Sequence, residues 1–84
     1  MARVSGGRPL VLQVDPAELP TLPAYGLEIV DIRGGHIWES TLTPRDGRLQ
    51  AKMPRSLNEG RYWVRLYRPA PSKELLREYG LEVR

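Results

Sequence analysis

No cysteine occurs among the 84 residues of the chain, so neither a disulfide bond nor a thiolate-bound metal can stabilise it. No apolar run approaches the ~20 residues that span a bilayer, so we expect no membrane insertion by this segment. His36 is the only histidine, and Asp31 and Glu39 are only loose candidates to join it, so we expect neither a metal site nor a cofactor. A chain of this length buries about 60–65% of its unfolded surface, which predicts one domain with a thin core.

The residues that enzymes use for catalysis are also scarce. The available nucleophiles are serines, and no sequence pattern pairs any of them with a base. Glu28 and Asp31 are an odd number of residues apart, which places their carboxylates on opposite faces of a strand. Residues 5–8 contain two glycines but precede a predicted strand rather than a helix, unlike a phosphate-binding loop. We therefore predict that the protein is not an enzyme.

Glycine-containing turns divide the sequence into short segments of β-branched and aromatic residues. They are Gly34-Gly35, Asp46-Gly47 and Asn58-Glu59-Gly60, about 12 residues apart. We expect Gly34-Gly35 to form a two-residue hairpin turn in which both glycines have positive φ, and Asp46-Gly47 to turn a second hairpin. The predicted strands cover residues 9–14, 27–32, 37–42, 48–53, 61–68 and about 76–83.

The end of the chain fits two local structures. Ser72 and Gly80 are typical of the start and the end of a helix, which allows a short helical turn near 72–76. Residues 76–83 also alternate as a strand, which we favour because a final strand would cover the edge of the sheet.

The connections between the predicted strands indicate two sheets rather than one. Residues 15–24 and 69–75 are long enough to cross from one sheet to another. The sequence therefore predicts an all-β, immunoglobulin-like sandwich of about six to seven antiparallel strands. We expect a flexible leader over residues 1–8 and a single β-sandwich domain over residues 9–84.

The alternation of apolar and polar residues predicts which side chains face the core. It is clearest in residues 61–68, where the outward positions are Trp63, Arg65 and Tyr67. The predicted inward set consists of Leu10, Leu12, Val14, Leu27, Ile29, Trp38, Leu42, Leu49, Met53, Leu57, Tyr62, Val64, Leu66, Leu81 and Val83.

Several short patterns along residues 9–84 resemble those of bacterial immunoglobulin-like modules. The patterns are Tyr25-x-Leu27-x-Ile29-x-Asp31, Ile37-Trp38, Gly60-x-Tyr62-x-Val64-x-Leu66 and Tyr79-x-Leu81-x-Val83. In particular, the chain is similar to the β-sandwich modules that follow the membrane segment of zinc-finger anti-sigma-factor-like proteins. This resemblance implies a periplasmic or other extracytoplasmic location and no catalytic residues. The 84 residues contain neither a zinc finger nor a membrane segment, so they cannot regulate a sigma factor by themselves.

The outward residues Trp63, Arg65 and Tyr67 are the first candidate binding site, because aromatic rings beside an arginine can stack on a partner's side chains, on sugars or on bases. The alternative is that these side chains only cover the sheet, with Glu78 and Glu82 of the next strand pairing with Arg65 and Arg61.

Positive charge suggests a second candidate. The net charge is +3, but residues 45–68 carry seven basic and two acidic residues, a net charge of +5 that is offset by −2 elsewhere. Arg48 and Arg61 belong to this region, which could bind an anionic polymer such as nucleic acid or an acidic glycan.

Together these features favour a non-catalytic protein-interaction or sensory accessory module of a larger bacterial envelope protein, with another protein as its partner. Binding of an anionic polymer is the first alternative. A structural spacer or self-association unit is the second.

Overall fold

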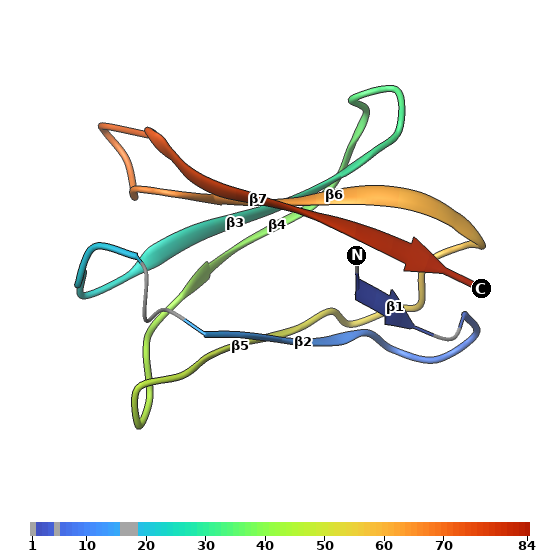
Figure 1. Ribbon diagram of the computed structural model, residues 1–84, viewed down its shortest axis with the longest axis horizontal. Coiled ribbons are helices and arrows are strands. Elements are labelled where there is room, and N and C mark those ends of the chain that lie inside the picture. The colour runs from blue at the N-terminus through green and yellow to red at the C-terminus, as the bar shows by residue number, and fades with distance from the viewer. Residues whose placement is uncertain (1, 5, 16–18) are drawn as a thin grey trace.

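Two layers of β-strands make up the protein in the computed structural model, which describes residues 2–4, 6–15 and 19–84 (Figure 1). The described residues contain no helix, and therefore none long and apolar enough to cross a bilayer. The prediction of an all-β fold is confirmed. The strands are β1 (Ala2–Val4), β2 (Val11–Val14), β3 (Tyr25–Asp31), β4 (His36–Leu42), β5 (Leu49–Lys52), β6 (Gly60–Tyr67) and β7 (Leu75–Val83).

Five strands form the larger sheet in the order β1-β7-β6-β3-β4, and β2 and β5 form the smaller one. All pairs are antiparallel except β1, which runs parallel to β7. Residues 2–4, which lie within the predicted leader, therefore form the edge strand of the larger sheet. The Gly6 N–H also donates to the Arg84 carbonyl at 2.6 Å. These contacts supply β7 with a neighbour on the side that would otherwise be an open edge.

The connection from β6 to β7 does not cross between sheets, contrary to the prediction for residues 69–75. The two strands are antiparallel neighbours in the larger sheet, and the Arg68 N–H donates to the Glu74 carbonyl at 2.8 Å to close the hairpin. The alternative of a helical turn near 72–76 is also wrong, because β7 begins at Leu75 and pairs with β6 along its length. Sheet pairing satisfies more backbone groups than a short helix would. The predicted crossover over residues 15–24 does join the two sheets; its residues 16–18 lie outside the described residues.

The β3–β4 hairpin is organised by a carboxylate rather than by two glycines in the left-handed region. The loop has four residues, 32–35, and of its two glycines only Gly34 has positive φ. Asp31 Oδ1 accepts hydrogen bonds from the N–H groups of Arg33 (2.9 Å) and Gly35 (2.7 Å). A Cβ at position 35 would lie 2.7 Å from Asp31 Oδ2. Glycine at position 35 leaves room for the close approach of the carboxylate, and its φ is not positive.

The Asp46-Gly47 turn forms as predicted, but the strands on either side separate. Both residues have positive φ, 52° and 71°, and the Arg45 and Arg48 backbones exchange two hydrogen bonds of 2.9 Å, as a type I′ turn requires. The chain then leaves the larger sheet, and β5 pairs with β2. The prediction of a hairpin between residues 37–42 and 48–53 is therefore wrong.

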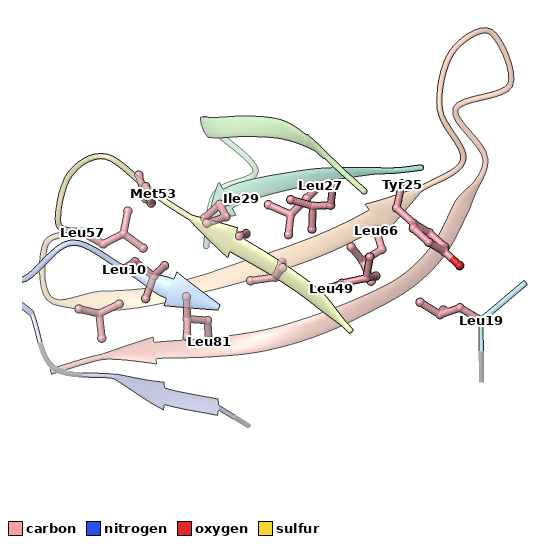
Figure 2. Close-up of a cluster of buried hydrophobic side chains, with 14 residues drawn as sticks. Leu10, Leu19, Tyr25, Leu27, Ile29, Leu49, Met53, Leu57, Leu66 and Leu81 are labelled. Atoms are coloured by element: carbon pink, nitrogen blue, oxygen red, sulfur yellow. The ribbon is translucent and has the colours of Figure 1, made fainter. Parts of the chain in front are cut away.

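The core lies between the two sheets (Figure 2). Most of the predicted inward set is buried there, with Ile29, Leu49 and Leu66 fully inaccessible. The exceptions, which are half-buried and pack against the core, are Leu12, Val14, Trp38 and Tyr62. The buried residues that the sequence did not predict are Leu19, Tyr25, Val30 and Ala51.

Tyr25 holds the crossover segment against the first residues of β3. Its side chain is 2% exposed. The hydroxyl donates to the Pro20 carbonyl at 2.5 Å and accepts from the Leu22 N–H at 3.2 Å. The ring therefore belongs to the core, while its polar end satisfies two backbone groups of residues 20–22, which lie outside the strands of both sheets.

Candidate binding surface

The outer face of the larger sheet carries the predicted residues of β6. Inward Val64 and Leu66 are buried, whereas Trp63 on the opposite face remains 38% exposed. Because side chains alternate along a strand, Trp63, Arg65 and Tyr67 share the outer face. The structure therefore brings these three candidate residues together as one row along the centre of the sheet.

Neighbouring strands place a partner on each side of this row. Trp63 stands in register with Val30 of β3 and Gly80 of β7, and Arg65 with Glu28 and Glu78. Val30 is only 2% exposed although it is not part of the core cluster. The residues in register that can cover it are Trp63 and, on β4, His36. The outer face therefore has a small apolar layer of its own.

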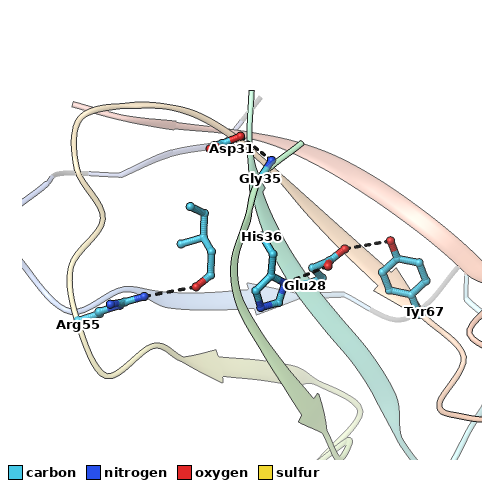
Figure 3. Close-up of polar contacts among 7 residues, drawn as sticks. Glu28, Asp31, Gly35, His36, Arg55 and Tyr67 are labelled. Carbon is cyan, nitrogen blue, oxygen red and sulfur yellow. Dashed lines mark hydrogen bonds and ion pairs between the residues drawn. The ribbon is translucent and has the colours of Figure 1, made fainter. Parts of the chain in front are cut away.

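Glu28 contacts Tyr67 of β6 on one side and His36 of β4 on the other (Figure 3). One carboxylate oxygen accepts from the Tyr67 hydroxyl at 3.2 Å, and the other lies 3.1 Å from His36 Nδ1. Burial raises the pKa of the Tyr67 phenol above its usual value, and the neighbouring Glu28 carboxylate raises it further, whereas Arg65 opposes the change. Tyr67 thus remains a neutral hydrogen-bond donor at neutral pH.

Arg65 is fixed by Glu78 on the other side of the row. Its Nε donates to Glu78 Oε2 at 2.7 Å, and this hydrogen bond raises the pKa of the guanidinium. Arg61 lies further along the same face, with its Nε 4.0 Å from Glu82 Oε2. Both cross-strand pairs that belonged to the alternative interpretation, in which these side chains only cover the sheet, are therefore present. Both side chains are about one-third exposed, so solvent screens the Arg65 pair and it adds little to stability.

Arg48 lies elsewhere, at the turn that leads into β5 of the smaller sheet. The positive charges of residues 45–68 are thus divided between two parts of the molecule, and they do not form the single basic region that the sequence suggested. Arg61 and Arg65 are on the outer face of the larger sheet with carboxylate neighbours.

The sequence did not identify Val30, Glu28 or His36 as part of this surface. The alternation of β3, with Leu27 and Ile29 inward, is a signal that could have placed Glu28 outward. No local signal shows that β3 lies beside β6, because register between strands is decided by the whole sheet.

This arrangement of side chains on the outer face is suited to contact with a partner molecule. An exposed tryptophan lies beside an arginine and a tyrosine whose orientations are fixed by hydrogen bonds to Glu78 and Glu28. No protein-family model matches the chain, and comparisons with curated proteins and with solved structures found no match. The interpretation of this surface therefore rests on its own chemistry.

Proposed function

We propose that the protein is a non-catalytic interaction module that binds another protein through the outer face of its larger sheet. The observation that carries the proposal is Trp63, exposed at the centre of that face with Arg65 and Tyr67 in the same row. Tryptophan, tyrosine and arginine are the residues most enriched among those that dominate binding energy at protein interfaces.

The hydrogen bonds within the face support this assignment. Arg65 and Tyr67 are held by Glu78 and Glu28 before any partner arrives. Ordering a free arginine on binding costs about 0.5–1.5 kcal/mol, and a side chain that is already fixed avoids much of this loss. The carboxylates of Glu28 and Glu78 offset the positive charge of Arg65. The face therefore suits a partner that packs over the aromatic rings and accepts a hydrogen bond from the Arg65 guanidinium.

We assign the domain to the immunoglobulin-like class and to a larger bacterial envelope protein, outside the cytoplasmic membrane. Two facing sheets with crossover connections support the class. So does Tyr25, whose hydroxyl bonds to backbone groups a few residues upstream, as the tyrosine corner of such sandwiches does. The cellular context follows from the resemblance of the strand pattern to extracytoplasmic modules of anti-sigma-factor-like proteins.

The test is capture of a partner from the envelope fraction of the source organism, with the intact chain as bait. Trp63→Ala and Arg65→Ala should each lose a protein that the unchanged chain retains. Val11→Ala is the matched control, because Val11 is 49% exposed on β2 of the smaller sheet and lies away from the row. Circular dichroism of each variant confirms folding.

Retention of the partner by both face variants would contradict the assignment. Concentration-dependent sedimentation of the unchanged chain, abolished by Trp63→Ala, would instead identify the partner as a second copy.

A further inference from the structure

A groove lies between the edge of the larger sheet and the smaller sheet, away from the row of Trp63. Its walls are formed by the end of β4, by β5 with one residue of β2, and by the turn between them. The lining includes residues 40–42 of β4 together with Arg45, Asp46, Arg48, Gln50 and Lys52.

Both strands that border the groove are edge strands. β4 is the last strand of the larger sheet, and β5 pairs on one side only, with β2. β5 is also the strand of the smaller sheet that contacts β4. At the start of β4, the Arg55 guanidinium donates to the Ile37 carbonyl at 3.3 Å (Figure 3), whereas the end of β4, residues 40–42, faces the groove. An edge strand presents backbone donors and acceptors that an added strand can pair with.

The groove is basic, and its cations are not neutralised within the protein. Arg45, Arg48 and Lys52 are exposed, and across residues 6–15 and 19–84 none of them has a carboxylate partner or a side-chain hydrogen bond. Asp46 is the one acidic residue in the lining. These three cations differ from Arg65, which forms an ion pair with Glu78. The groove therefore has a net charge of +2 available to a ligand.

The spacing of the polar side chains from Arg48 to the end of β5 matches that of an extended peptide. Arg48, Gln50 and Lys52 are exposed and alternate with buried Leu49 and Ala51. Outward side chains two residues apart are roughly 7 Å apart, and alternate side chains of any extended peptide have the same repeat. The lining contains no aromatic residue, so it lacks the stacking surface with which proteins bind unpaired bases.

We propose that this groove binds an extended, acidic segment of a partner protein. The segment adds as a strand along the edge of β4, and its carboxylates at alternate positions contact Arg45, Arg48 and Lys52. The site does not depend on the outer face of the larger sheet, so either assignment can stand without the other.

The probe is a dye-labelled ten-residue peptide of alternating glutamate and threonine, followed by fluorescence anisotropy on the intact chain. Two matched peptides separate the contribution of charge from that of backbone hydrogen bonds. The first has glutamine in place of every glutamate, and the second has alternate backbone amides methylated. We expect the first to lose binding because its charges are gone. We expect the second to bind several-fold more weakly because a methylated amide cannot donate to the β4 edge.

The protein variant is Arg45→Gln, Arg48→Gln and Lys52→Gln combined. Its control carries Arg8→Gln, Arg33→Gln and Lys73→Gln, three exposed cations outside the groove, so the total charge changes equally. We expect about tenfold weaker binding by the groove variant, which is roughly twofold for each exposed ion pair lost, and less than a threefold change in the control. Circular dichroism verifies that both are folded.

Several results would overturn the proposal. Equal weakening in the two variants would reduce the effect to overall charge, and full binding of the methylated peptide would exclude strand addition. Tighter binding of a ten-nucleotide oligothymidylate or a heparin fragment, lost in the groove variant, would make this a general polyanion site. No saturation by the acidic peptide up to about 1 mM would exclude the site altogether.

Discussion

Removal of one hydroxyl group, in Tyr25→Phe, tests whether Tyr25 holds the crossover between the sheets. The phenylalanine ring can keep the packing of a side chain that is 2% exposed. The Pro20 carbonyl and the Leu22 N–H lose their partner, at 2.5 and 3.2 Å respectively. A hydrogen bond contributes about 0.5–1.5 kcal/mol net, so the loss of two should cost about 1–3 kcal/mol.

Urea unfolding followed by tryptophan fluorescence measures this loss. The midpoint should fall while the slope stays unchanged, since the folded state buries the same surface. The melting temperature should fall by about 4–8 °C for each kcal/mol in a domain of this size.

Tyr62→Phe is the matched control for this experiment. The Tyr62 hydroxyl donates to a single carbonyl, that of Asn58 at 2.8 Å, at an exposed position. Water can replace this bond, so we expect a loss below about 1 kcal/mol. If Tyr25→Phe cost no more than Tyr62→Phe, the hydroxyl of Tyr25 would not be what fixes the crossover.

Two further predictions concern the β3–β4 turn and the outer face. Gly35→Ala places a Cβ 2.7 Å from Asp31 Oδ2, so the carboxylate must move and its two exposed hydrogen bonds weaken. This should cost up to about 1 kcal/mol in urea unfolding and clearly less in an Asp31→Ala background, and equal costs would contradict the contact. Tyr67 has a pKa raised above 10.0, so the folded state keeps this proton where the unfolded state releases it. The stability that this proton contributes should be complete below pH 10 and be lost as pH rises through the folded pKa. A titration of tyrosinate absorbance should show one component above pH 10. This component should be absent in Tyr67→Phe and should shift to lower pH in Glu28→Gln.

The sequence was sufficient for the strand content and for the direction of most side chains. In β6 the alternation placed Val64 and Leu66 in the core and Trp63 and Arg65 outside, as the structure has them. The Asp46-Gly47 turn was equally predictable because few residue pairs adopt two successive positive φ values.

The errors have a common physical origin in contacts between distant parts of the chain. The β5 strand left its expected hairpin partner for β2, and residues 2–4 paired with β7. The Asp31 turn is an exception, because its carboxylate accepts from Arg33 and Gly35 of the same turn, which is a local pattern typical of aspartate. The β2–β5 and β1–β7 partners, by contrast, are too far apart in sequence for a local pattern to indicate the pairing.

The sequence by itself determined that this chain forms strands, where most of them turn, and which side chains point inward, because alternation is a property of the extended backbone of each segment. Only the tertiary structure decided which strands are neighbours. It therefore decided that Glu28 and Glu78 flank Arg65, and that Arg45, Arg48 and Lys52 line a groove apart from it. Pairing and register depend on the free energy of the whole sheet and core, which no single segment contains.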